Sequence, residues 1–117
     1  GLKTAISLAE LNIKTMCLGG SVNYKNLSLN STHAVEFIKG INADIFLFSS
    51  DGFDGENVTD NSFEECVLRR AFIKNAKKKV LLIDNGKINV KCKYNLCSIN
   101  EVDNIISNKE NTAIFIK

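Results

Sequence analysis

The chain of 117 residues contains no proline, no tryptophan and no long apolar run. Its longest uninterrupted apolar runs, Ile45 to Phe48 and Val80 to Ile83, are far shorter than the roughly 20 residues that a membrane-spanning helix needs. The sequence therefore predicts no membrane segment. We attribute the missing proline, together with the abundance of asparagine, lysine and isoleucine, to the base composition of the source genome.

An excess of one charge is also lacking. The 15 basic and 13 acidic residues give a formal net charge of +2 and are mixed along the chain, so nothing in the charge pattern demands a nucleic acid or an anionic membrane as partner. The only basic cluster is Lys77 to Lys79. We expect it where a helix ends and a strand begins, because lysines there meet the negative end of the helix dipole.

Metal ligands are sparse. The one histidine, His33, is accompanied by four cysteines, of which only Cys92 and Cys97 lie close together in sequence. A zinc site usually needs tighter cysteine pairs or more histidines, so we predict no metal site and no cofactor. Because no secretory leader precedes Cys17, we expect reduced thiols and a cytoplasmic location.

The remaining composition, 44% hydrophobic and 24% charged, is typical of one globular domain with a packed core. Hydrophobic periodicity, glycine turns and capping residues predict an α/β fold, a three-layer Rossmann-like, mostly parallel sheet with helices on both faces. The expected elements are a helix over residues 2–11, a strand over 13–18, a glycine turn at 19–21, a helix from 31 or 32 to 39, a strand over 43–49 covered on both faces, a turn at 51–55, a helix over 62–77 capped by Asn61 with Glu64, a strand over 80–84, a short strand and partial helix within 92–106, and a last strand over 112–116.

Polar residues follow several of these predicted strands. In open parallel sheets, ligands bind beyond the carboxyl ends of the strands, where we expect these residues to gather. Carboxylates accept hydrogen bonds from sugar hydroxyls, and an ammonium group attracts a phosphate. We therefore predict a ligand-binding set without catalytic residues, made of Gly19, Gly20, Asp51, Gly52, Asp54, Glu65 and Lys87.

Other interpretations of these residues stay open. Gly19 and Gly20 suit a plain strand exit as well as an anion-binding turn. Asp51 and Asp54 are suited to satisfying turn backbone, and Glu65 to pairing with Arg69 four residues later. Calcium is poorly supported, because an EF-hand loop starting at Asp51 would have non-ligand residues at ligand positions and no glycine at its sixth.

Five short motifs in order resemble the effector-binding domain of DeoR-family transcriptional repressors, over about residues 4–108. They are Leu18-Gly19-Gly20, Leu27 to Asn30, Asp44 to Asp54, Val58-Thr59 with Glu65 to Ala71, and Leu81 to Lys87. The sequence departs from the family pattern at Asn30, where a glycine is common, and at Asn85-Gly86, where two serines are usual. The tail after Asn108 is also shorter than in the family.

The resemblance implies a fold related to ribose-5-phosphate isomerase and glucosamine-6-phosphate deaminase, used to sense a phosphorylated sugar. It implies a homo-oligomer and an amino-terminal helix-turn-helix domain that binds operator DNA. We expect residues 1–117 to be a partial effector domain, without that DNA-binding domain and without the phosphate loop of the family.

Two alternatives to a sensor remain. A sugar-phosphate isomerase would need further proton-transfer groups, but Gly55 replaces the second acid of the isomerase turn, and residues 57–64 hold neither its lysine nor its glycines. We therefore do not expect an enzyme. The other alternative is an oligomerisation module without a ligand.

Overall fold

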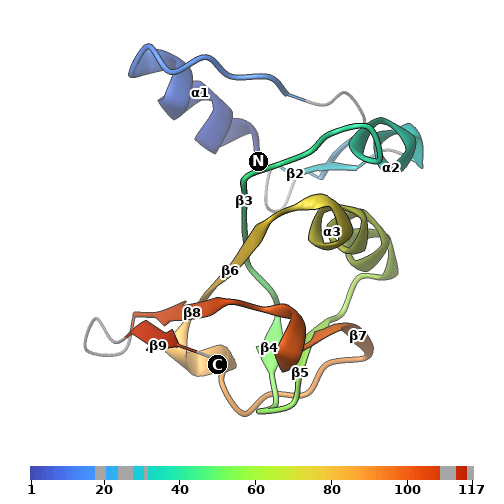
Figure 1. Ribbon diagram of the computed structural model, residues 1–117, viewed down its shortest axis with the longest axis vertical. Coiled ribbons are helices and arrows are strands. Elements are labelled where there is room, and N and C mark those ends of the chain that lie inside the picture. Colours follow the sequence, from blue (N-terminus) through green and yellow to red (C-terminus); the bar gives the residue numbers. More distant parts are fainter. Residues whose placement is uncertain (18–20, 24–27, 31, 109–112, 116–117) are drawn as a thin grey trace. The chain divides into compact units, whose positions relative to one another are not determined.

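The computed structural model describes residues 1–17, 21–23, 28–30, 32–108 and 113–115, and it divides into two units, Gly1–Phe37 and Ile38–Lys117 (Figure 1). The first unit holds helix α1 (Leu2–Glu10), the antiparallel strands β1 (Ser21–Asn23) and β2 (Ser28–Asn30), and nearly all of helix α2 (Thr32–Ile38). Both predicted helices of this region are confirmed.

The strand expected over 13–18 is wrong for its described part. Residues 13–17 form neither helix nor strand, and Ile13 and Met16 are 49% and 71% exposed. Alternating apolar residues favour a strand only where a neighbouring strand completes the hydrogen bonds, and no described strand pairs with this segment. Gly19 and Gly20 lie outside the described residues.

The larger sheet of the second unit confirms the predicted α/β class. Strands β3 (Ile45–Phe48), β6 (Lys78–Ile83) and β8 (Asn104–Ser107) are parallel, and β9 (Ala113–Phe115) pairs with β8 in the antiparallel sense. Phe48 lies opposite Leu81, which lies opposite Ile105. The carboxyl ends of β3, β6 and β8 therefore share one edge of the sheet.

Helix α3 (Phe63–Asn75) lies between β3 and β6 in the chain and packs on one face of this sheet. Phe46 stacks on both Phe48 and Phe72, with ring centroids 4.8 Å apart in each pair. The Ser62 side chain caps the helix by accepting a hydrogen bond from the Glu65 N–H at 3.2 Å. The cap predicted at Asn61 is therefore one residue too early, since the serine hydroxyl meets the third helical amide.

A second sheet was not predicted. Strands β4 (Gly52–Phe53), β5 (Asn57–Asp60) and β7 (Tyr94–Ser98) form an antiparallel sheet in the order β4-β5-β7. The expected turn over 51–55 is thus wrong in extent, because Gly52 and Phe53 are a strand and the chain reverses at 54–56. Likewise the 92–106 region holds two strands, β7 and β8, joined by the short 3-10 helix η2 (Ile99–Glu101).

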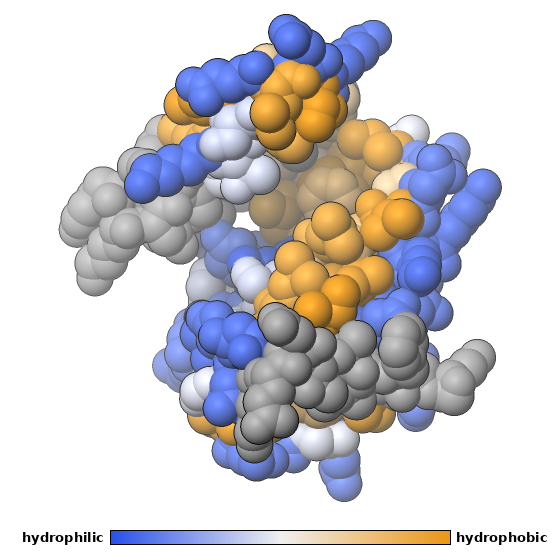
Figure 2. All heavy atoms as spheres, turned by 90° about the vertical axis from the view of Figure 1, so that its left-hand side faces the viewer, coloured by the Kyte–Doolittle hydropathy of each residue, from blue (hydrophilic) through white to orange (hydrophobic). Residues whose placement is uncertain are grey.

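The core of the second unit lies between the two sheets and α3. Its fully buried side chains include Ile38, Val58, Thr59, Leu81 and Leu96. The other face of the larger sheet is different: Ile45 and Leu47 are 56% and 61% exposed, so the expectation that this strand is covered on both faces is wrong for these two side chains. Figure 2 shows apolar side chains at the surface of the molecule. None of the described helices has the length and apolar character to cross a membrane.

Candidate functional site

The candidate site begins at the carboxyl edge of the larger sheet. Asp51 follows β3, and Lys87 ends the 3-10 turn η1 (Asn85–Lys87), which follows β6. The two side chains interact electrostatically, because the positive charge of Lys87 is one of the influences that lower the pKa of Asp51. Both residues thus lie at the edge where the sequence placed them, and their role in binding a ligand stays a prediction.

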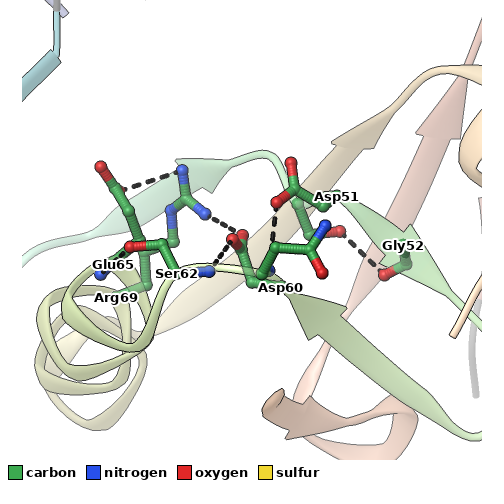
Figure 3. Close-up of polar contacts among 8 residues, drawn as sticks. Asp51, Gly52, Asp60, Ser62, Glu65 and Arg69 are labelled. Atoms are coloured by element: carbon green, nitrogen blue, oxygen red, sulfur yellow. Dashed lines mark hydrogen bonds and ion pairs between the residues drawn. The ribbon is translucent and has the colours of Figure 1, made fainter. Parts of the chain in front are cut away.

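Asp51 is held by neighbours on the smaller sheet. Its Oδ2 accepts a hydrogen bond from the Asn61 N–H at 3.1 Å, and Asp60 lies near it (Figure 3). Burial alone would raise the pKa of Asp51. The Asp60 side chain and the hydrogen bond from the Asn61 N–H, with the charges of Lys87 and Arg69, outweigh burial and lower that pKa. Asp51 thus stays an ionised acceptor.

Asp60 continues the network toward α3. Its side chain, only 4% exposed, contacts Nη1 of Arg69 at 2.5 Å and accepts a hydrogen bond from the Ser62 N–H at 3.2 Å. Arg69 also pairs with Glu65 at 3.3 Å, which supports the alternative interpretation of Glu65, and its role as a ligand contact stays a prediction. Figure 3 shows Asp60 between Asp51 on one side and Arg69 on the other. The network therefore links the sheet edge to the first turns of α3.

The turn that carries Lys87 is fixed from two sides. The Asn108 side chain, which follows β8, accepts a hydrogen bond from the Asn85 N–H at 2.8 Å. After the turn, the Phe53 carbonyl accepts a hydrogen bond from the Asn89 N–H at 2.7 Å, which ties this segment to β4. Lys87 is therefore placed by backbone and side-chain contacts from both sheets.

Asp54 lies in the reversal between β4 and β5, and not at the sheet edge. Its Oδ1 accepts hydrogen bonds from the Asn57 N–H at 2.7 Å and the Glu56 N–H at 2.9 Å, and these bonds lower the pKa of Asp54. The structure thus supports the turn interpretation for this residue. It does not bring Asp54 into the network around Asp51, and Asp54 as a ligand contact stays a prediction.

Gly52 is buried in β4 beside Asp51. A Cβ atom at this position would lie 2.5 Å from the Val90 carbonyl oxygen and 2.8 Å from Thr59 Oγ1. The absence of a side chain thus permits close approach of two chain segments under the site. Whether Gly52 also contacts a ligand stays a prediction.

The structure brings three of the predicted residues, Asp51, Glu65 and Lys87, into one neighbourhood, with Glu65 connected through Arg69. Asp60 and Asn108 were missed. Asp60 ends β5, a strand that the sequence did not predict, although Val58, Thr59 and Asp60 lie just before the Ser62 helix cap. Asn108 directly follows a strand, which is the same signal that identified Asp51.

This arrangement can bind a polar anion. Asp51 offers an acceptor to hydroxyl groups, and Lys87 offers a cation to a phosphate or carboxylate. Within the described residues no three His, Cys, Asp or Glu side chains are grouped so that they could hold a metal ion. None of the four cysteines, all of which the structure describes, forms a disulfide, and burial raises the pKa of Cys97 to about 12.

Comparison with known proteins gives consistent matches. The family described as the DeoR C terminal sensor domain matches residues 1–109. The chain is 32% identical over its full length to the HTH-type transcriptional regulator GolR of Listeria innocua, of which it covers 47%. It is 23% identical, over 92% of its length, to 44% of the HTH-type transcriptional repressor GlcR of Bacillus subtilis. An uncharacterised HTH-type transcriptional regulator of Haemophilus influenzae is 26% identical over 80% of the chain and is matched over 37% of its own length. The chain thus spans about half the length or less of these relatives.

Proposed function

We propose that this chain, which belongs to the DeoR family of transcriptional regulators through its C-terminal sensor domain, binds a phosphorylated sugar that controls operator binding by the full-length protein. The family and the names of its relatives are those of transcription regulators and not of enzymes. The proposal concerns the effector and its effect on DNA.

The position of Asp51 and Lys87 at the carboxyl edge of the same sheet carries this proposal. A sugar phosphate presents hydroxyl donors at one end and a charged phosphate at the other, and the site offers an acceptor and a cation at the same edge of the sheet. A binding site needs no group that stabilises a transition state.

Ligand binding can control operator binding through thermodynamic linkage between the two sites. If the ligand binds one arrangement of the protein more tightly than another, it shifts the population toward that arrangement. Where the arrangements also differ in operator affinity, ligand and operator change each other's affinity by the same factor. The three relatives are each named as HTH-type regulators, and we propose the same DNA-binding mode for the full-length protein, acting as a homo-oligomer in the cytoplasm.

Titration calorimetry of the full-length protein tests the effector. The panel would hold glucose 6-phosphate, fructose 6-phosphate, ribose 5-phosphate and the unphosphorylated sugars. We expect one phosphosugar to bind and its unphosphorylated form to bind much more weakly. Failure of every phosphosugar to bind the folded protein would refute the proposal and favour the oligomerisation module.

Charge removal tests the site itself. Lys87→Gln should weaken binding by about tenfold or more, since a hydrogen bond to a charged group contributes about 1.5–3 kcal/mol. The matched control is Lys91→Gln, which removes an exposed lysine near Asp54 instead. An equal loss in both variants would show that only the overall charge matters and would remove Lys87 from the site.

A further inference from the structure

Asn89 lies two residues after Lys87 and has a left-handed backbone, with a φ of 65°. Among the described residues other than glycine, only Asn12 shares a positive φ. The left-handed region is unfavourable for residues with a Cβ atom, although asparagine tolerates it better than most. Such a conformation persists where the surrounding structure fixes it. The contacts around Asn89 therefore indicate what its backbone does.

The contacts that follow Asn89 come from the smaller sheet. The Phe53 carbonyl in β4 accepts hydrogen bonds from the Asn89 N–H at 2.7 Å and from the Val90 N–H at 3.2 Å. Further along, Oγ1 of the fully buried Thr59 in β5 accepts a hydrogen bond from the Cys92 N–H at 2.9 Å. Three backbone amides thus bind the chain that follows η1 to β4 and β5.

The contacts that precede Asn89 belong to the turn η1. The Asp84 carbonyl accepts a hydrogen bond from the Lys87 N–H at 2.9 Å, and the Asn85 carbonyl accepts one from the Ile88 N–H at 3.2 Å. Ile88 then has an ordinary extended backbone, with φ −77° and ψ 138°. The left-handed residue that joins the turn to its contacts on β4 is therefore Asn89.

The side chain of Asn89 does not explain its position. It is exposed and forms no hydrogen bond with the residues that the structure describes. What the position contributes is its backbone conformation, which asparagine adopts more readily than other residues with a side chain. This conformation lies two residues from the cation of the candidate site.

We propose that Asn89 is a positioning residue of the effector site, whose left-handed backbone holds η1 against β4 and so fixes where the ammonium group of Lys87 meets the ligand. The inference rests on the proposed sugar-phosphate site. Asn89 acts through Lys87 and need not touch the ligand. A residue that disfavours this backbone should let the turn move, so that ligand binds only the fraction of molecules in which Lys87 is in place.

The affinities of Asn89 variants of the full-length protein test this inference, by calorimetry with the phosphosugar that binds among the three named above. Asn89→Gly should bind as wild type does, because glycine adopts the left-handed region readily. Asn89→Val should lose affinity by about three- to tenfold, because a β-branched residue is least suited to that region. Asn89→Ala should lose less, and it decides the matter if Asn89→Val does not fold.

The matched control is Asn12→Val, at a φ of 59° in the first unit, after the end of α1. This variant has the same substitution in the same backbone conformation. It should lower the melting temperature and leave the affinity unchanged. Wild-type affinity in Asn89→Val, with only a lower melting temperature, would overturn the inference, because the position would then serve folding alone. An equal loss of affinity in the two variants would overturn it as well.

A double-mutant cycle tests the route through Lys87. The Lys87→Gln background has no ammonium group to place, so adding Asn89→Val to it should cause little further loss of affinity. A role in folding alone would not depend on the residue at position 87. Losses that multiply in the double variant would show that Asn89 acts independently of Lys87 and would overturn the inference.

A measurement without ligand separates this inference from the proposed function. Amide hydrogen exchange, followed by NMR, reports how firmly the turn is held. Exchange of the Lys87 and Ile88 N–H groups should be faster in Asn89→Val than in wild type, and Asn89→Gly should resemble wild type. If no phosphosugar binds, the effector is wrong, yet exchange still decides whether Asn89 holds the turn. Unchanged exchange of both amides in Asn89→Val would refute that role.

Discussion

The side-chain oxygen of Asn108 accepts a hydrogen bond from the backbone N–H of Asn85 at 2.8 Å, which joins the ends of two parallel strands, β8 and β6. Asn85 opens the turn that ends at Lys87. One side chain beyond the third strand thus fixes the turn that carries the cation of the candidate site.

Replacing Asn108 by alanine should therefore weaken ligand binding without removing any group that contacts the ligand. The bond is exposed, so we expect a loss of about 0.5 kcal/mol, or about twofold in affinity. Calorimetry with the phosphosugar found for wild type measures it. The control is Asn100→Ala in η2, which should bind as wild type does. An unchanged affinity in Asn108→Ala would show that the turn keeps its shape without this bond.

Asp51 and Asp54 should respond differently to the same substitution. Asp51→Asn should lower ligand affinity about tenfold, because a charge-assisted hydrogen bond to a hydroxyl is lost. Asp54→Asn should leave affinity unchanged and lower the melting temperature, because its carboxylate accepts two turn amides. Calorimetry and thermal unfolding of both variants separate these effects. A loss of affinity in Asp54→Asn equal to that in Asp51→Asn would instead support Asp54 as a ligand contact, as the sequence predicted.

Sequence reasoning recovered the parallel strands and the residues that follow them, because buried strands and helix caps leave local patterns. Ile45 to Phe48 and Val80 to Ile83 are such patterns, and both are strands in one parallel sheet. Lys87 and Asp51 were identified in this way. Their meeting follows from topology, since the carboxyl ends of parallel strands lie at one edge.

The antiparallel sheet could not be predicted from the same patterns. β4 has two residues, and its pairing with β5 depends on Gly52 passing close to the Val90 carbonyl, a contact 38 positions away in sequence. Asp60 was missed with its strand. Its burial depends on Arg69 from α3, so its role is set by packing and leaves no local signal.

Gly52 should tolerate no side chain. In Gly52→Ala, the new Cβ would lie 2.5 Å from a backbone oxygen and 3.0 Å from the Cys92 sulfur, so the two segments must separate. We expect a loss of about 1–3 kcal/mol in the free energy of unfolding, typical of overpacking. Urea unfolding measures it. Gly86→Ala is the matched control, since no described atom lies within 4 Å of the position that its methyl group would take, and it should change stability by about 0.5 kcal/mol or less.

The cysteines should differ in reactivity. Cys97 is buried and burial raises its pKa to about 12, and burial also raises the pKa of the Cys66 thiol. Thiolates react with maleimide and thiols do not, so both should stay unlabelled in the native protein at pH 8. Exposed Cys17 should be labelled first, and Cys17→Ser should remove the fast phase. All four should react in urea. Rapid native labelling of Cys97 would contradict the packing of the core.

Asp51 and Asp60 should affect the pH dependence of stability in opposite directions. The folded-state pKa of Asp51 is lowered, so its contribution is present above the ordinary value of 3.8 and is lost as pH falls through its folded pKa. The folded-state pKa of Asp60 is raised, so its contribution is present below 3.8 and is lost as pH rises through its folded pKa. The two windows lie on opposite sides of the ordinary value.

Urea unfolding of wild type, Asp51→Asn and Asp60→Asn at a series of pH values tests this. The advantage of wild type over Asp60→Asn should shrink as pH rises above 3.8, since only wild type must ionise a buried carboxyl. The advantage over Asp51→Asn should shrink as pH falls below 3.8. The same pH dependence in both comparisons would contradict the opposite directions in which the surroundings shift the pKa values of Asp51 and Asp60.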